Sequence, residues 1–266
     1  MKSFWMLSIT SVLLFYTDLS HAQPTLKNVN LKPKAGLTLQ LLSEDGRNGS
    51  AVAWIDEFKK YYTLVAGNAD YPLEVFDEKG KNIQSIPAGA DFRGLWYNPE
   101  YLFLEGNTYD YHDILSFGMD EKGLVTDEVP YEELYELPVY NPQAVLNMDT
   151  ELNMYIWLNS ESQEIIFIDA ETGEEGEALQ VDIPAGFENI NATTVVYTGI
   201  KGGEYALLNY ADKLIYLIDG ATGKENATIK LPSNTVSNQS FCFSFANGHF
   251  WLFDVDKRIW QGFKVL

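Results

Sequence analysis

The chain has 266 residues, of which 38 are Asp or Glu and 18 are Lys or Arg, so its formal net charge is −20 at pH 7. This charge would repel nucleic acid and anionic membrane surfaces, so neither is an expected partner. The single cysteine, Cys242, excludes a disulfide within the chain, and the apolar alternation around it predicts a buried, inert thiol.

The N-terminus has the pattern of a secretory signal peptide. Lys2 precedes an apolar stretch over residues 4–16, and the small side chains of Ser20 and Ala22 favour cleavage before Gln23. The apolar stretch is shorter than a membrane-spanning helix requires. An N-terminal membrane anchor is the alternative interpretation.

Residues 1–22 are therefore expected to form the signal peptide, and residues 23–266 to form one domain. A chain of this size fits a single barrel or propeller, and no linker rich in Pro, Ser or Gly divides it. We expect a monomer secreted to a bacterial periplasm or to the cell exterior, without membrane insertion after cleavage.

A strand-and-turn element occurs four times along the chain. Its loose copies are "PLEVFDEKGK" and "DILSFGMDEKG", and its close copies are "EIIFIDAETGEE" and "KLIYLIDGATGKE". The turn glycines Gly80, Gly123, Gly173 and Gly223 are 43, 50 and 50 residues apart. A strand-turn-strand unit at this period predicts a β-propeller.

Short apolar or alternating runs, separated by Gly, Asn, Asp and Pro, predict four strands in each of four blades and three strands in a fifth. In chain order, the predicted strands are residues 51–55, 61–66, 73–77 and 82–86; 94–97, 101–105, 114–118 and 124–129; 144–147, 154–158, 164–169 and 179–183; 194–198, 205–209, 213–219 and 227–231; and 241–245, 249–254 and 258–265.

The fifth blade needs an outer strand, because an unpaired sheet edge is a liability. Residues 37–42, "LTLQLL", alternate apolar and polar side chains as a half-buried strand does. The sequence therefore predicts an all-β propeller of five four-stranded blades, closed by this N-terminal strand. Six blades are the alternative, if residues 27–29 and 129–140 contain further strands.

The recurring Asp in these repeats is typical of turn chemistry. Asp77, Asp169 and Asp219 each stand where the side chain can accept backbone hydrogen bonds within the turn, and the following glycine can adopt positive φ. We interpret the three carboxylates as turn formers and not as catalysts.

The repeats "LIYLIDGATGKE" and "IIFIDAETGEE" resemble those of quinoprotein-type and YVTN-type β-propellers, in which an apolar strand ends in Asp and a Thr-Gly-Lys turn follows. The resemblance implies the propeller fold from about Trp54 to the C-terminus. Quinoprotein repeats often carry a Trp shortly after the turn, whereas the corresponding stretches here, "GEALQV" and "NATIKL", have none. No quinone or other cofactor is expected.

Aromatic and acidic side chains concentrate between residues 92 and 140. Tyr and Trp offer a large, rigid surface with a polar tip, which suits recognition, and "TDEVPYEELYELP" at residues 126–138 adds five acids without a base. This segment is either a binding patch for a glycan or a basic peptide, or a set of inter-blade packing residues beside a solvated loop. The candidate ligand-binding residues are Trp96, Tyr97, Tyr109, Tyr111, His112, Tyr131 and Tyr135.

Metal-binding and catalytic motifs are weak. His112 lies between Asp110 and Asp113, which suits a metal ligand or a general base, but a lone His is more typical of a surface loop. Residues 147–153, "NMDTELN", space oxygen ligands as calcium loops do but lack the turn glycine, so they predict a turn. No metal site is expected.

Three functions follow from these observations. The first is a non-catalytic binding or scaffold module for a protein or glycan, because the repeats carry turn chemistry without site chemistry. The second is a carbohydrate-active hydrolase with a carboxylate cluster at the propeller pore. The third is a docking platform formed by the acidic loop over residues 127–136.

Overall fold

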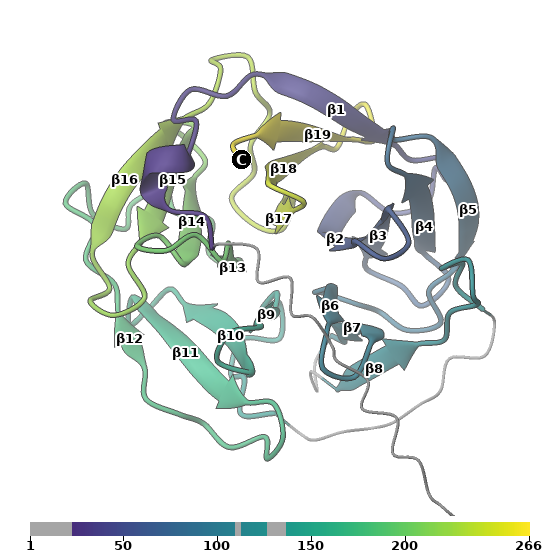
Figure 1. The fold of residues 1–266 in the computed structure, drawn as a ribbon, viewed down its shortest axis with the longest axis horizontal. Coiled ribbons are helices and arrows are strands. Elements are labelled where there is room, and N and C mark those ends of the chain that lie inside the picture. Colours follow the sequence, from purple (N-terminus) through teal and green to yellow (C-terminus); the bar gives the residue numbers. More distant parts are fainter. Residues whose placement is uncertain (1–22, 110–112, 127–136) are drawn as a thin grey trace, which may run out of the picture.

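The computed structural model describes residues 23–109, 113–126 and 137–266. They form five antiparallel sheets arranged in a ring, as Figure 1 shows along the ring axis. Blade one consists of β2 (Asn48–Ile55), β3 (Lys60–Ala66), β4 (Pro72–Asp77) and β5 (Asn82–Pro87). Blade two consists of β6 (Trp96–Asn98), β7 (Phe103–Asn107) and β8 (Ile114–Phe117).

The remaining blades follow in chain order. Blade three consists of β9 (Asn147–Asp149), β10 (Met154–Asn159), β11 (Glu164–Asp169) and β12 (Leu179–Gln180). Blade four consists of β13 (Val196–Tyr197), β14 (Tyr205–Asn209), β15 (Leu214–Ile218) and β16 (Glu225–Lys230). Blade five consists of β17 (Phe243–Ala246), β18 (His249–Asp254), β19 (Ile259–Lys264) and β1 (Ala35–Gln40).

The predicted five-bladed propeller is thus confirmed, including its closure by an N-terminal strand. The six-bladed alternative is wrong: residues 27–29 overlap a 3-10 helix, Leu26–Asn28, because Asn28 and Val29 N–H donate to Thr25 and Leu26 carbonyls. In blade two, the strand predicted at 124–129 begins with a bridge between Met119 and Val125 and then leaves the described residues. Among the residues that the structure describes, no helix is long and apolar enough to cross a membrane.

The core consists of apolar layers between adjacent blades. The middle strands are apolar on both faces, since each blade packs against a neighbour on either side. Five clusters of buried side chains result, one at each contact between blades. They are represented by Leu64 and Leu104 (blades one and two), Trp96 and Trp157 (two and three), Ile156 and Leu207 (three and four), Leu208 and Phe250 (four and five), and Tyr61 and Trp260 (five and one).

The closing strand β1 pairs with β19 in antiparallel register, with Leu39 opposite Trp260. Leu39 is 0 % exposed and belongs to the layer between blades five and one. The segment that follows β1 is hydrogen-bonded to blade five and to blade one. Arg258 Nε donates to the Ser43 carbonyl at 2.8 Å, and the buried Glu74 carboxylate accepts the Leu42 and Ser43 N–H groups at 2.9–3.0 Å.

The Thr-Gly turn of blade four contacts the neighbouring blade. Asp219 Oδ1 accepts the N–H groups of Ala221 and Thr222, which confirms its role as a turn former, and Gly223 has φ +69°. The turn packs against the outer strand of the preceding blade, because Asp182 N–H donates to the Gly223 carbonyl at 2.8 Å. A Cβ on Gly223 would collide with the Gln180 carbonyl oxygen, so the glycine is required by conformation and by space.

Cys242 is predicted to be unreactive toward thiol reagents in the folded protein. The thiol is 1 % exposed, and burial raises its pKa to about 12. Because the thiolate is the reactive form, Ellman's reagent is expected to modify no thiol in the native protein and one thiol per chain in urea. Prompt modification without denaturant would contradict the buried position.

Candidate functional site

The C-terminal ends of the five innermost strands meet at one face of the ring. A cavity of about 320 Å³ lies there, and residues at or near the C-terminal ends of β2, β6, β9, β13 and β17 line it. In Figure 1 these strands are the ones closest to the ring centre. We call this cavity the aromatic mouth, after four of its lining residues: Trp54, Tyr97, Tyr197 and Phe245.

The four aromatic residues occupy similar positions in four blades. Each is the last or penultimate residue of its innermost strand, and each is half-buried. Blade three has the buried Met148 at the penultimate position, preceded by the half-buried Asn147. The circular arrangement of the blades therefore brings together aromatic side chains that are far apart in sequence.

Packing fixes the Trp54 side chain. Its ring centroid lies 4.4 Å from that of Tyr61, which in turn meets Trp251 edge to face at 5.1 Å. The Trp54 indole N–H donates to Asp56 Oδ1 at 3.3 Å, and Asn247 Nδ2 donates to the Tyr61 hydroxyl at 2.7 Å. A ligand would thus meet a preorganised wall, which lowers the entropy cost of binding.

Two buried carboxyl groups lie directly behind the mouth. Glu105 accepts the Trp96 indole N–H at 3.0 Å and an Asn98 amide N–H at 3.2 Å. Asp149 accepts the Tyr205 hydroxyl at 2.6 Å. Burial raises the pKa of both carboxyls above the ordinary range. No Asp or Glu is among the described residues that line the mouth itself.

The pKa shift of Asp149 predicts a pH effect on stability. Burial is the largest cause and outweighs the hydrogen bonds from Tyr205 and the turn backbone, so the folded pKa exceeds 3.8. The stabilisation from protonated Asp149 is then fully present below the unfolded pKa and is lost as pH rises through the folded pKa. Asp149→Asn is expected to remove this part of the fall in the free energy of unfolding, which urea denaturation measures at a series of pH values from below the unfolded pKa upward.

A turn carboxylate provides the control for this experiment. Hydrogen bonds from the Thr172 and Glu171 backbone lower the pKa of Asp169. Its contribution is present above the unfolded pKa and is lost as pH falls, so Asp169→Asn should change the profile in the opposite sense. An Asp149→Asn profile parallel to that of the parent would show that Asp149 titrates as it does in water.

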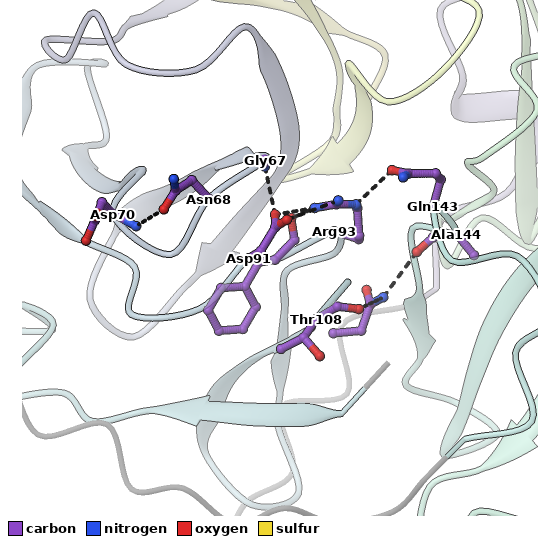
Figure 2. A network of polar contacts seen from close by, with 10 residues as sticks. Gly67, Asn68, Asp70, Asp91, Arg93, Thr108, Gln143 and Ala144 are labelled. Atoms are coloured by element: carbon purple, nitrogen blue, oxygen red, sulfur yellow. Dashed lines mark hydrogen bonds and ion pairs between the residues drawn. The ribbon is translucent and has the colours of Figure 1, made fainter. Parts of the chain in front are cut away.

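A polar network lies at the other ends of the innermost strands, away from the aromatic mouth (Figure 2). Arg93, which precedes β6 and is 4 % exposed, forms an ion pair with Asp91 and donates from Nε to Gln143 Oε1 at 3.0 Å. Asp91 Oδ1 also accepts the Gly67 N–H at 2.7 Å. The guanidinium lies 4.5 Å from the ring centroid of Tyr109. The network therefore ties blades one, two and three together away from the mouth.

The structure separates the predicted ligand-binding residues. Trp96 and Tyr97 both line the mouth, although Trp96 is buried and hydrogen-bonded. Tyr109 follows β7 at the other end of the blade, is 38 % exposed and covers Arg93, so it shares no surface with Tyr97. Tyr111, His112, Tyr131 and Tyr135 lie outside the described residues, as does the acidic loop over residues 127–136.

Sequence reasoning missed three of the four aromatic residues that name the mouth: Trp54, Tyr197 and Phe245. Their shared signal is an aromatic side chain near the end of the first strand of a blade, which an alignment of the innermost strands would have revealed. Within residues 147–153, β9 ends at Asp149 and the predicted turn follows, since Asp149 Oδ1 accepts the Glu151 and Leu152 N–H groups. Across the described ranges, no group of three or more His, Cys, Asp or Glu side chains could hold a metal ion.

Comparisons with known proteins support the fold. No protein-family model matches the chain, and no curated protein matches it in sequence. Among solved structures, Myxococcus xanthus glutaminyl cyclase is similar, with a TM-score of 0.53 and 11% sequence identity over 90% of this chain and 99% of that chain. A chain of the nidogen–laminin complex is similar over 74% of this chain and 68% of that chain, with a TM-score of 0.45 and 14% identity. At this identity the first likeness shows the β-propeller fold alone.

Proposed function

We propose that this protein is a secreted, monomeric, non-catalytic binding module of the quinoprotein-like or YVTN-like propeller type, and that a group of its protein or glycan ligand enters the aromatic mouth. The observation that carries the proposal is the set of four half-buried aromatic side chains around a cavity of about 320 Å³. Binding sites are typically concave and largely apolar, with a few polar groups that orient the ligand. Asn147, Thr150 and Asn247 supply such groups here.

The rigidity of the scaffold supports the same function. The mouth is formed by the ends of strands from all five blades, so its shape is set by the inter-blade layers and not by one loop. Rigid aromatic surfaces with polar tips are common anchors of recognition sites because they lose little conformational entropy on binding.

An enzyme is the second candidate, because the pKa values of Glu105 and Asp149 are raised beside the mouth. Glycoside hydrolysis needs two carboxyl groups that face the scissile bond, whereas each of these carboxyls is buried and already hydrogen-bonded by Trp96 or Tyr205. Release of reducing ends from glycans tests this candidate. Cyclisation of a peptide with N-terminal glutamine tests the activity named for the Myxococcus neighbour.

The binding proposal is tested by calorimetry with a panel of glycans and peptides. Trp54→Ala and Tyr97→Leu are expected to weaken the ligand at least tenfold, which corresponds to about 1.4 kcal/mol. Tyr140→Ala is the matched control, because Tyr140 is 78 % exposed and does not line the mouth. Melting temperatures of all variants are measured first, so that loss of folding is not mistaken for loss of binding.

Two results would contradict the proposal. One is a ligand that binds Trp54→Ala and Tyr97→Leu as tightly as it binds the parent protein. The other is turnover of a glycan or peptide that is lost in Glu105→Gln or Asp149→Asn, since that result would make the protein an enzyme.

A further inference from the structure

Acidic side chains lie on three of the turns beside the aromatic mouth. The turns that follow β2, β6 and β9 carry the exposed residues Glu57, Glu100 and Glu151. None of the three belongs to an ion pair among the described residues. Glu151 accepts a hydrogen bond from the Gln23 side-chain amide at 2.8 Å, which leaves its charge in place. We call these three residues the acidic rim.

Positive charges near the mouth offset the rim only in part. Lys59, on the same turn as Glu57, is paired with Asp56 at 2.6 Å. Lys201 is the lysine on the corresponding turn of blade four. In blade five, burial lowers the pKa of His249, so its imidazole is neutral at pH 7. No Lys, Arg or His is among the described residues that line the cavity.

The negative charge acts on the groups that form the mouth. The pKa of the Tyr97 hydroxyl is raised by burial and then by the charge of Glu57. The pKa of Tyr197 is raised by burial and then by Asp149 and Glu151. Both phenols therefore stay neutral at pH 7.

These features together favour one charge on the ligand. The face of an aromatic ring attracts an alkylated ammonium group, and the attraction grows when the cation is desolvated in a pocket. Carboxylates beside such a cavity draw cations toward it and repel anions. A neutral sugar would gain binding free energy from contact with the aromatic side chains but none from the charges of the acidic rim.

We propose that the group that enters the aromatic mouth is an organic cation, an alkylated or primary ammonium group. This inference rests on the proposed ligand site and adds the charge of the ligand to it. The ammonium group is carried by a small molecule, by a modified lysine side chain of a protein or by an amino sugar of a glycan, and the test separates these three sources.

The test uses three pairs of probes, each made of a cation and a neutral counterpart, and the first pair also shares its shape. They are choline and 3,3-dimethylbutan-1-ol, glucosamine and N-acetylglucosamine, and a tripeptide with trimethyl-lysine and its norleucine counterpart. Calorimetry at low salt is expected to show at least tenfold tighter binding of the cation in one pair or more, and added salt should weaken it. The pair with the largest preference identifies the source.

Variants locate the effect. Trp54→Ala is expected to abolish binding of the preferred cation. The double variant Glu57→Gln/Glu151→Gln is expected to weaken the cation at least threefold and to leave its neutral partner unchanged. Glu161→Gln is the matched control, because Glu161 is an exposed acid on the β10–β11 turn, at the other end of blade three. It should change neither affinity.

The outcomes distinguish this inference from the proposed function. Equal binding of cationic and neutral probes, lost in Trp54→Ala, overturns the inference and supports the ligand site. Cation binding that survives in Trp54→Ala and in the double variant overturns the inference by placing the cation elsewhere. Absence of cation binding also overturns it, and the proposed function is then decided by the glycan and peptide panel.

Discussion

Deletion of residues 23–40 is expected to abolish the cooperative unfolding transition of the propeller. The deletion removes Leu39 from the layer that it shares with Trp260 and leaves β19 without its outer partner. Loss of a buried leucine side chain alone costs about 2–5 kcal/mol, and a domain is typically stable by only about 5–15 kcal/mol. Urea unfolding followed by circular dichroism measures the transition, and size-exclusion chromatography detects the association that a free strand edge promotes.

A rearranged chain is the control for this deletion. Ala35 pairs with Phe263, so β1 can follow β19 as the second strand of a hairpin. Residues 34–40, placed after Leu266 through a short flexible linker, should restore the transition because the pairing is the same. An unchanged unfolding midpoint in the deleted chain would show that β1 does not close the ring.

Gly223→Ala is expected to lower the free energy of unfolding by about 3 kcal/mol or more. The substitution imposes φ +69° on an alanine and directs its Cβ into the Gln180 carbonyl oxygen. Because that oxygen belongs to the outer strand of blade three, the contact between blades three and four has to open. Urea denaturation at 25 °C measures the loss.

Gly186→Ala separates the two causes. Gly186 has φ +78°, and nothing lies within 4 Å of a Cβ built there. Its substitution should therefore cost only the left-handed backbone conformation, about 1–2 kcal/mol. Equal losses in the two variants would mean that the turn of blade four does not press on its neighbour.

Local chemistry explains why the blades were predictable from the sequence. Apolar strands and Asp-glycine turns depend on neighbours in the chain, so each blade is visible without its partners. The start of blade three was misplaced, because the apolar residues 144–147 resemble a strand, whereas β9 is Asn147–Asp149. The N–H groups of Val145 and Leu146 donate instead to the Thr193 carbonyl and to Asn107 Oδ1, which belong to other blades.

The candidate site was less predictable, because ring closure assembles it. Trp96 and Tyr97 stand in a segment dense in aromatic residues, which drew attention to them. Trp54, Tyr197 and Phe245 belong to other blades and meet Tyr97 only when all five blades are in place. Tyr109 was grouped with Tyr97 by proximity in the chain, but β7 carries it to the other end of the blade.

The positions of Gln23 and Val265 have a practical consequence for surface-based assays. Gln23 donates to Glu151 of the acidic rim, and Val265 N–H donates to the carbonyl of Gly248, next to the mouth residue Asn247. An affinity tag at either position would therefore hold the mouth against a sensor chip. A cysteine in place of the exposed Ala211, on the β14–β15 turn, would orient the mouth toward the solution, and the buried Cys242 would not compete for the coupling reagent.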